Sequence, residues 1–334
     1  MAGKQLIPPG LTYLADNITT KDNLLGASKD VGARWAKDLN LPKDRDTIFF
    51  AGCGYQFSNE LESLMSVIRK MDKSAIGSDL AMSLAGFQKK LGVDAAGILR
   101  KVLAKGDDAA QPLKDAVKVL SHLGIEFGYL ADDEPCCGGL LHYIGLEKEF
   151  AQHAQKAYDQ LKSMGVKRII SMVPSCTYTL RQLISDRVNG FDLEVRHFTE
   201  VVQENISSRE MRFPREVKVT YHDPCQLVRY LELVEEPRQI LRAIKGVELV
   251  EPDWTRGEWA TCCGGGGGFE AVFPELSEIL AVNRAKELLE TGAEIIVTNC
   301  PGCIMQLKAG LKELKNSTVE VLDLAQVVAL ATEG

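Results

Sequence analysis

The chain has 334 residues, of which 45% are hydrophobic and 25% are charged, and its formal net charge is −7. That length can bury one large core or two modest ones. The negative charge gives no electrostatic reason to bind nucleic acid or anionic lipid. No apolar run approaches the roughly 18 residues of a membrane-spanning helix, and the first residues lack the apolar segment of a secretory signal. We therefore expect a cytoplasmic protein that would reach a membrane only through a partner.

The apolar pattern, taken in chain order, describes two similar halves. After an N-terminal helical lead-in (1–45), the first half (46–207) contains short apolar, β-branched segments that predict strands, and the second half (214–334) repeats them. In the first half these segments are 47–53, 125–130, 168–176 and 193–195, and in the second half they are 217–225, 247–250, 294–300 and 319–321. Amphipathic helices, for example 147–164 and 276–289, are predicted between them.

Strands that alternate with helices predict an α/β fold of two pseudo-symmetric lobes, with mostly parallel sheets flanked by helices. Four of the predicted strands are followed at once by a cysteine, namely Cys53, Cys176, Cys225 and Cys300. In such sheets ligands bind at the carboxyl ends of the strands. We therefore expect the cysteines on loops after strand ends, where a shared site would be built. The break between the halves is expected near Ser207 to Pro214, a polar stretch that ends in proline.

The first half carries a longer segment than the second between its first cysteine and its cysteine pair. The excess maps to about 72–111 and contains apolar residues at helical spacing, with a stop signal at Gly106. We expect one or two inserted helices there. Such helices would pack on the fold as a decoration, or they would form a docking surface for a partner or a lid over the site.

All nine cysteines fall into two sets that share one order. The complete set is Cys225, Cys262, Cys263, Cys300 and Cys303, and the first set is Cys53, Cys136, Cys137 and Cys176. Adjacent cysteines cannot readily satisfy disulfide geometry with each other. A structural zinc site uses four ligands and has no need of a vicinal pair. Since iron–sulfur clusters are held by thiolates, we interpret the complete set as an iron–sulfur site, with zinc and structural thiols as the alternatives.

Five glycines, Gly264 to Gly268, follow the cysteine pair of the complete set. A phosphate-binding loop would need a lysine that this run lacks. Glycine leaves open the space that a Cβ would fill. We therefore interpret the run as backbone that approaches a cluster closely.

The pattern Cys-x36-Cys-Cys-Gly-x35-Cys-x2-Cys resembles the cysteine-rich CCG domain of heterodisulfide reductase catalytic subunits of the B/D type. Relatives include the iron–sulfur subunits of glycolate and lactate oxidation systems and of sulfur-metabolism membrane complexes. The resemblance covers most of the chain and extends to the N-terminal segments Asn17-Ile18, Asn23-Leu24-Leu25-Gly26 and Arg34-Trp35. In that family the five cysteines hold a non-cubane 4Fe–4S cluster. The resemblance thus implies such a cluster at the complete set and a second 4Fe–4S-type cluster at the first.

The resemblance also implies a function, namely reductive cleavage or the reverse formation of a disulfide or related sulfur bond, with the substrate sulfurs held between two clusters. The substrate would be a small-molecule or protein-bound disulfide or thiol. The chain has no ferredoxin cysteine run, so electrons would come from a separate ferredoxin-like iron–sulfur subunit, with a flavin-binding subunit beyond it. The alternative is an electron-relay subunit between a flavoprotein dehydrogenase and a quinone or another carrier, without its own substrate.

Thr179 stands where the complete motif has Cys303, so the first set offers four thiolates. Four thiolates can hold a cubane cluster, although the vicinal pair makes its geometry awkward. The alternatives are a non-cubane cluster with a hydroxyl, water or substrate at the remaining position, and loss of the cluster. The catalytic candidates are Thr179, where a substrate sulfur could bind, and His222, which could donate a proton, hydrogen-bond a ligand sulfur or cap its strand. Further candidates for the same loops are His142, Asp223 and Arg229.

Overall fold

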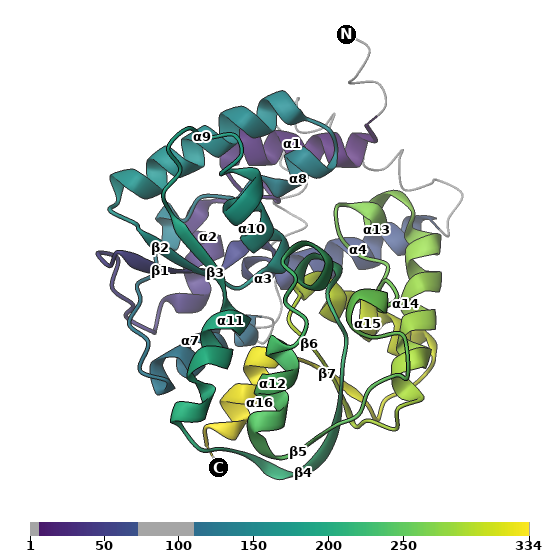
Figure 1. Ribbon diagram of the computed structural model, residues 1–334. Coiled ribbons are helices and arrows are strands. Elements are labelled where there is room, and N and C mark those ends of the chain that lie inside the picture. Colours follow the sequence, from purple (N-terminus) through teal and green to yellow (C-terminus); the bar gives the residue numbers. More distant parts are fainter. Residues whose placement is uncertain (1–6, 73–109, 334) are drawn as a thin grey trace.

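The computed structural model describes residues 7–72 and 110–333 of the chain. The chain forms two sheets of parallel strands with helices packed on them, which confirms the predicted α/β fold (Figure 1). The predicted insertion at about 72–111 falls almost wholly outside the described residues. Within the described ranges, no helix combines the length and the apolar composition that crossing a membrane requires.

The first sheet has the strand order β1-β2-β3, and all its strands run parallel. Its strands are β1 (Thr47–Phe50), β2 (Arg168–Ser171) and β3 (Glu194–His197). Beyond their first residues β1 and β2 are buried, as expected of parallel strands covered on both faces. The predicted strand at 125–130 is reduced to one parallel bridge between Gly128 and Ile48. The next residue, Tyr129, donates its backbone N–H to the Pro42 carbonyl instead (2.9 Å), so the chain leaves the edge of the sheet.

The second sheet has the strand order β5-β4-β6-β7 and is also parallel. Its strands are β4 (Met211–Tyr221), β5 (Ile244–Leu249), β6 (Ile295–Thr298) and β7 (Glu320–Asp323). In this sheet β4, β6 and β7 take the places of β1, β2 and β3, and β5 lies where the Gly128 bridge flanks β1. The sequence repeat is therefore a structural repeat. Pro214 lies within β4, where the pairing with β5 shifts between Arg212 and Val217, and a missing N–H is tolerated at such an irregularity.

The buried faces of the helices follow their apolar spacing. In α9 the buried residues Phe150, Ala154, Ala157 and Leu161 recur every three or four positions, which places them on one side of the helix. The longer helices are α1 (Pro9–Lys21), α4 (Ser58–Asp72), α7 (Gln111–His122), α9 (Glu147–Ser163), α14 (Pro274–Leu289) and α15 (Pro301–Glu313). The shorter ones are α2 (Lys29–Ala33), α3 (Gly52–Gln56), α8 (Gly139–Tyr143), α10 (Pro174–Tyr178), α11 (Phe198–Asn205), α12 (Glu236–Ala243), α13 (Phe269–Val272) and α16 (Leu324–Ala331).

The two halves are interlocked by an exchange of helices. The last helix of the first half, α11, packs against α12 of the second half, and the last helix of the second half, α16, packs against α7 of the first (Figure 1). Both last helices begin with a capping box, built by His197 with Glu200 and by Asp323 with Gln326. One continuous buried core consequently includes residues of both sheets.

A buried hydrogen bond also joins the halves. Tyr55 of α3 donates its hydroxyl to Asp323, and the other carboxyl oxygen of Asp323 accepts the backbone N–H of Ala325 (2.8 Å). Asp323 is fully buried, and this burial raises its pKa from 3.8 to about 7, although the hydrogen bonds from Tyr55 and Ala325 oppose the rise. In the folded protein this carboxyl group therefore keeps its proton up to about pH 7.

We expect Asp323→Asn to remove a pH dependence of the folding stability. Between about pH 4 and about pH 7 the folded state holds a proton that the unfolded state has released. The stabilisation is therefore complete below about pH 4 and is lost as the pH rises through about 7. A shift of about three units corresponds to roughly 4 kcal/mol at most. Urea unfolding of parent and variant is measured at about pH 5 and at about pH 8. The free energy of unfolding of the parent should fall between these pH values by more than that of the variant. An equal fall in both proteins would contradict the prediction.

Candidate metal centre

The cysteines of both sets gather at the carboxyl ends of the two sheets. Cys53 and Cys176 lie in α3 and α10, which follow β1 and β2, while Cys225 and Cys300 lie just after β4 and β6. Since parallel strands end at the same edge, each sheet brings its cysteines together there. The two cysteine pairs arrive on the loops that precede α8 and α13. All nine cysteines are free thiols.

In the first set the sulfur atoms approach one another in pairs. Cys53 Sγ lies 3.8 Å from Cys136 Sγ, and Cys137 Sγ lies 3.3 Å from Cys176 Sγ. Three of the four are buried, and Cys137 is half-buried. The hydrogen bond with Cys136, together with burial, raises the pKa of the Cys53 thiol well above its ordinary value. Because ligand thiols must lose their protons, a bound cation would offset the cost of holding these thiolates in a buried site.

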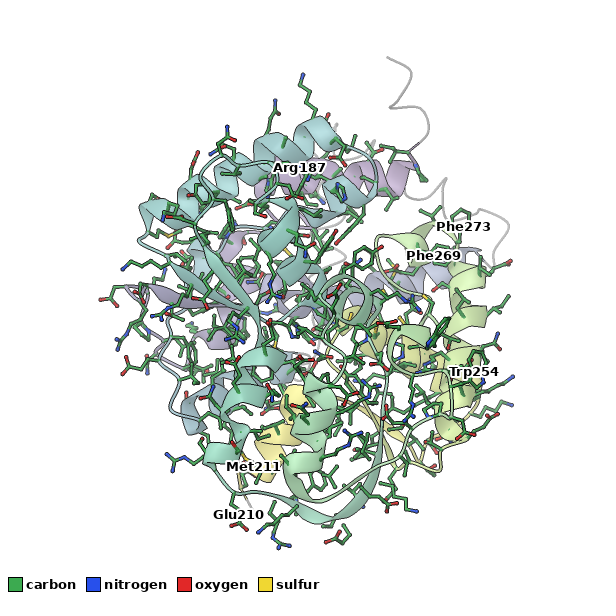
Figure 2. All side chains as sticks on the ribbon, viewed as in Figure 1. Arg187, Glu210, Met211, Trp254, Phe269 and Phe273 are labelled. Atoms are coloured by element: carbon green, nitrogen blue, oxygen red, sulfur yellow. The ribbon has the colours of Figure 1, made fainter. Side chains whose placement is uncertain are left out.

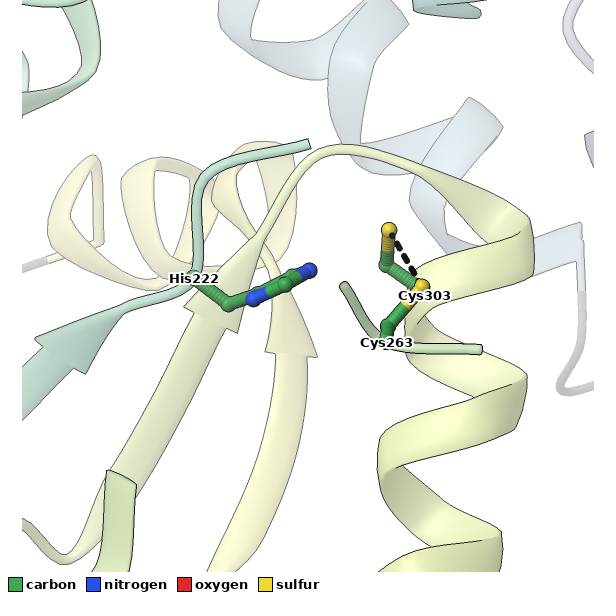
Figure 3. A group of neighbouring side chains, drawn as sticks. All are labelled: His222, Cys263 and Cys303. Atoms are coloured by element: carbon green, nitrogen blue, oxygen red, sulfur yellow. Dashed lines mark hydrogen bonds between the residues drawn. The ribbon is translucent and has the colours of Figure 1, made fainter. Parts of the chain in front are cut away.

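In the second set one cysteine is exposed and the other four are buried or half-buried. Cys263 Sγ is 3.3 Å from Cys303 Sγ, and both are buried (Figure 3). Cys262, in contrast, is exposed. Hydrogen bonds from the Cys262 and Cys303 thiols, and contact with His222, lower the pKa of the Cys263 thiol. Burial raises the pKa of Cys225 to about 11. A small pocket that opens to solvent lies among Cys225, Cys262 and Cys263.

The backbone around the sulfur atoms fits an iron–sulfur cluster. Gly138 and Gly264, which follow the two cysteine pairs, direct their N–H groups at Cys136 Sγ (3.4 Å) and Cys262 Sγ (3.3 Å). A Cβ at Gly52 would lie 3.1 Å from a sulfur of the first set, so glycine keeps that sulfur clear. Thiolate donors and N–H groups directed at sulfur are the features by which proteins hold and tune such clusters.

The glycine run after the second cysteine pair makes close contacts with two helices. A Cβ at Gly264 would overlap the Ser277 carbonyl of α14, and a Cβ at Gly268 would overlap the Leu11 side chain of α1. Both glycines have positive φ, which side chains rarely allow. At these two positions the close contacts are with helices, and the approach of the glycine run to a cluster stays a prediction.

Asp223 and Arg229 hold the loops around the second set. Asp223 is buried, accepts two hydrogen bonds from Arg238 (2.8 Å each) and accepts a third from the Gly257 N–H (2.8 Å). Arg229 donates to the Ala260 carbonyl (2.7 Å). Both side chains therefore tie the turn after β4 to the loop that carries the cysteine pair.

The structure places His222 at the second set. Its ring lies beside the two buried sulfur atoms that are 3.3 Å apart, with the three potential ligand atoms within 4.8 Å of one another (Figure 3). Its Nδ1 accepts a hydrogen bond from Arg284 Nε (3.0 Å). The other candidate histidine, His142, pairs instead with Glu147 (2.6 Å).

Thr179 is buried at the position that corresponds to Cys303. Its hydroxyl donates to the Ser175 carbonyl, one helical turn earlier (2.7 Å), and lies close enough to the Tyr143 hydroxyl to oppose the rise in the pKa of Tyr143 that burial causes. A Cβ at Gly139 would overlap the hydroxyl oxygen of Thr179. Neighbouring protein groups therefore hold this hydroxyl in place.

Buried charged residues support the first set, and no motif in the sequence indicates them. Asp22 accepts the Cys136 N–H (3.0 Å) and pairs with Lys29 (2.6 Å), which also donates to the Glu134 carbonyl (2.8 Å). The Glu134 carboxyl accepts two backbone N–H groups at the start of α3 (2.9 Å each), and burial raises its pKa to about 7. The signal available in the sequence is position, because Asp22 and Lys29 lie between Asn17 and Trp35, in the N-terminal segments to which the family resemblance extends.

Both cysteine sets lie where the two halves meet. Helix α10, which carries Cys176, packs against the helical turn that follows Cys225. In the reciprocal contact α15, which carries Cys303, packs against α3. The second contact is close, since a Cβ at Gly54 would lie 2.7 Å from the Pro301 side chain. Two cysteine sets that are distant in sequence thus share one interface.

Tyr143, at the end of α8, reaches across this interface. Its hydroxyl donates to Gln226 (3.3 Å), the residue after Cys225, and lies near the Thr179 hydroxyl of the first half. A Cβ at Gly267 would lie 4.0 Å from the Tyr143 Cβ. Burial raises the pKa of Tyr143, so its hydroxyl keeps its proton at neutral pH. A protonated hydroxyl consequently lies between the two cysteine sets.

Comparison with known proteins finds iron–sulfur oxidoreductases. The chain is 36% identical over 224 residues to the D-type subunit of dihydromethanophenazine:CoB–CoM heterodisulfide reductase from Methanosarcina acetivorans, a match that covers 64% of this chain and 53% of that protein. It is 32% identical over 220 residues to the probable iron–sulfur-binding oxidoreductase FadF of Bacillus subtilis (65% and 31%). It is 33% identical over 239 residues to EtfAB:quinone oxidoreductase of Syntrophomonas wolfei (68% and 33%). The chain therefore spans about half the length of the first relative and about a third of the other two.

The matched family is described as CCG, a cysteine-rich domain, and it matches residues 101–181 and 219–308. The first match includes Cys136, Cys137 and Cys176, and the second includes all five cysteines of the second set. The first match contains β2, and the second contains the end of β4 together with β5 and β6, so each match lies in one of the two halves. The chain therefore belongs to the CCG cysteine-rich domain family and carries two copies of that domain.

Proposed function

We propose that the chain is the catalytic iron–sulfur subunit of a multisubunit electron-transfer complex, and that it cleaves, or in reverse forms, a disulfide or related sulfur bond. The observation that carries the proposal is the meeting of two cysteine sets at one interface, with Tyr143 between them. A pair of substrate sulfurs bound there would have a cysteine set on either side. The heterodisulfide reductase activity in the name of one relative supports the same chemistry.

Reductive cleavage of a disulfide consumes two electrons and two protons, since R–S–S–R′ becomes R–SH and R′–SH. Iron–sulfur clusters held by the two cysteine sets would supply the electrons and the iron that captures thiolate sulfur. Tyr143 is protonated, so its hydroxyl can donate to a sulfur that gains negative charge. Gln226 accepts a hydrogen bond from this hydroxyl (3.3 Å) and thereby holds it at the interface. Solvent replaces the protons that the products carry away.

We propose all nine cysteines as cluster ligands. The second set offers five thiolates including a vicinal pair, more than a cubane cluster takes, which supports a non-cubane 4Fe–4S cluster there. The first set offers four thiolates, which can hold a 4Fe–4S-type cluster of either form. Thr179, which lies near Tyr143, marks the side of the first set from which a substrate sulfur would approach.

A second candidate function is electron relay between a flavoprotein dehydrogenase and a quinone or another carrier, without a substrate of this chain's own. Thr179 favours it, because its hydroxyl is already bonded to the Ser175 carbonyl and adds no fifth thiolate. The name of a further relative, EtfAB:quinone oxidoreductase, points in the same direction.

Electrons would enter from a ferredoxin-like iron–sulfur subunit, with a flavin-binding subunit beyond it. Cys262 is the exposed cysteine of the nine. The loop before it carries two tryptophans, Trp254 and Trp259, with 72% and 74% of their surfaces exposed; Figure 2 shows Trp254 at the edge of the molecule. Tryptophan is enriched at the centres of protein interfaces. This face is therefore where we place the electron-donating partner.

A disulfide assay separates the two functions. Anaerobically reconstituted protein is given reduced viologen as an electron donor and a panel of disulfides, and we expect donor oxidation that depends on the disulfide. Tyr143→Phe should lower kcat at least about tenfold with the iron content unchanged, because the hydroxyl between the sets is lost. The matched control is Tyr158→Phe on α9, whose hydroxyl bonds the surface residue Asp192 (3.0 Å). Intact clusters without any disulfide-dependent turnover would contradict the proposal and favour the relay.

A further inference from the structure

Arg284 is a fully buried cation on the inner face of α14. A guanidinium is costly to bury unless its N–H groups are paired. Its Nη1 donates to Glu287 (2.7 Å) and to the Thr255 carbonyl (2.9 Å), and its Nε donates to His222 Nδ1 (3.0 Å). Nη2 is buried and has no hydrogen-bond partner in the part of the chain that the structure describes. The Arg284 side chain lies deep in the protein beside the second cysteine set, where an apolar side chain would be less costly to bury.

The contact with Arg284 fixes where the hydrogen of the His222 ring sits. A guanidinium has donors and no acceptor, so His222 Nδ1 must accept and cannot carry a hydrogen. The ring hydrogen of the neutral imidazole is therefore on Nε2. Figure 3 shows the far end of the ring directed toward Cys263 and Cys303, whose sulfur atoms lie within 4.8 Å of it.

A ring nitrogen that carries a hydrogen has no lone pair for a metal. It can instead donate to sulfur. We propose that Arg284 is a positioning residue that holds the His222 ring so that its Nε2–H donates a hydrogen bond to the sulfur atoms of the second set. In this role His222 neither binds a metal nor transfers a proton to the substrate. This inference rests on the proposed cluster at that set. Hydrogen bonds to ligand sulfur favour the more negative, reduced state of a cluster and so set its reduction potential.

The first set has no equivalent donor at this position. Phe50 precedes Cys53 by as many residues as His222 precedes Cys225, and Phe50 is buried and apolar. The two strand ends are otherwise equivalent, since β1 and β4 hold the same place in their sheets. The second cluster should therefore accept an electron more readily than it would with the residue found in the first half.

His222→Phe copies the first half and tests the donor directly. We expect the second cluster to assemble, with an equilibrium constant for its reduction about tenfold lower, as loss of one hydrogen bond to a charged group implies. Arg284→Met should lower this equilibrium constant as well. The double variant should lower it no further than His222→Phe alone, because Arg284 acts through His222. Redox titration followed by EPR measures all three. Arg284→Gln, whose amide nitrogen can occupy the place of Nε, should restore most of the parent value.

Pulsed EPR on protein labelled with ¹⁵N-histidine provides a second readout that needs no variant to fold. A hydrogen-bonded ring nitrogen gives a weak coupling to the reduced cluster, which supports the proposal. The strong coupling of a directly bound nitrogen would overturn it. A cluster whose reduction is unchanged in His222→Phe would also overturn it while leaving the proposed function intact. Absence of iron and sulfide from the second set would instead contradict the proposed function, and this inference with it.

Discussion

Cys263→Ser should remove the cluster of the second set. Cys263 is 4% exposed, its sulfur lies 3.3 Å from that of Cys303, and its thiol is the one whose pKa the neighbouring groups lower. A serine hydroxyl is a poor substitute for this thiolate, because it stays protonated at neutral pH. We expect the iron and acid-labile sulfide of one cluster to be lost, together with its EPR signal.

The matched control for this variant is Thr261→Ser, because Thr261 lines the same pocket and serine keeps its hydroxyl. It should retain the iron, the sulfide and the spectrum of the parent. If Cys263→Ser kept an unchanged spectrum and iron content, the assignment of the second set as a cluster site would be wrong.

The strand ends and their cysteines could be predicted because buried parallel strands are continuous apolar runs. Thr47–Phe50 and Ile295–Thr298 are short, β-branched or aromatic, and buried on both faces, so they stand out from the helical pattern around them. A cysteine just after such a run lies at the edge where ligands bind. The segment 125–130 includes Glu126 and Gly128 among its apolar residues and forms only a bridge, because the Tyr129 N–H is bonded to the Pro42 carbonyl.

The charged residues that support the site could not be predicted, because their partners come from other elements. Arg284 lies on a helix whose apolar spacing describes a core face, and its bond to His222 spans 62 positions. Asp22 meets the Cys136 backbone 114 positions away. Neither pair has a fixed spacing that a motif could record. The packing of α11 and α16 on helices of the opposite half could not be predicted either. An amphipathic pattern predicts that one face of a helix is buried, but not which element covers it.

Arg238→Met should lower the free energy of unfolding by about 3–5 kcal/mol, since one partner of a buried ion pair is removed. Arg238 donates to both oxygens of Asp223 (2.8 Å each) and to Glu251 (2.7 Å), and all three side chains are at least 95% buried. Methionine fills much of the same volume but leaves the buried Asp223 carboxylate without a cation, while Glu251 keeps only its longer ion pair with the half-exposed Arg256 (3.7 Å). Urea unfolding of parent and variant at neutral pH measures the difference.

The same helix provides the control, because Arg242 of α12 pairs with Glu235 at 3.4 Å and both side chains are more than half exposed. Exposed pairs contribute little, so Arg242→Met should unfold almost as the parent does, and equal losses in the two variants would contradict the argument from burial. Arg238→Met should also weaken iron retention at the second set. Asp223 accepts the Gly257 N–H in the loop that leads to the cysteine pair (2.8 Å), and a carboxylate freed from Arg238 no longer holds that loop in place. The stability of this half and the geometry of its cysteines thus depend on one buried guanidinium.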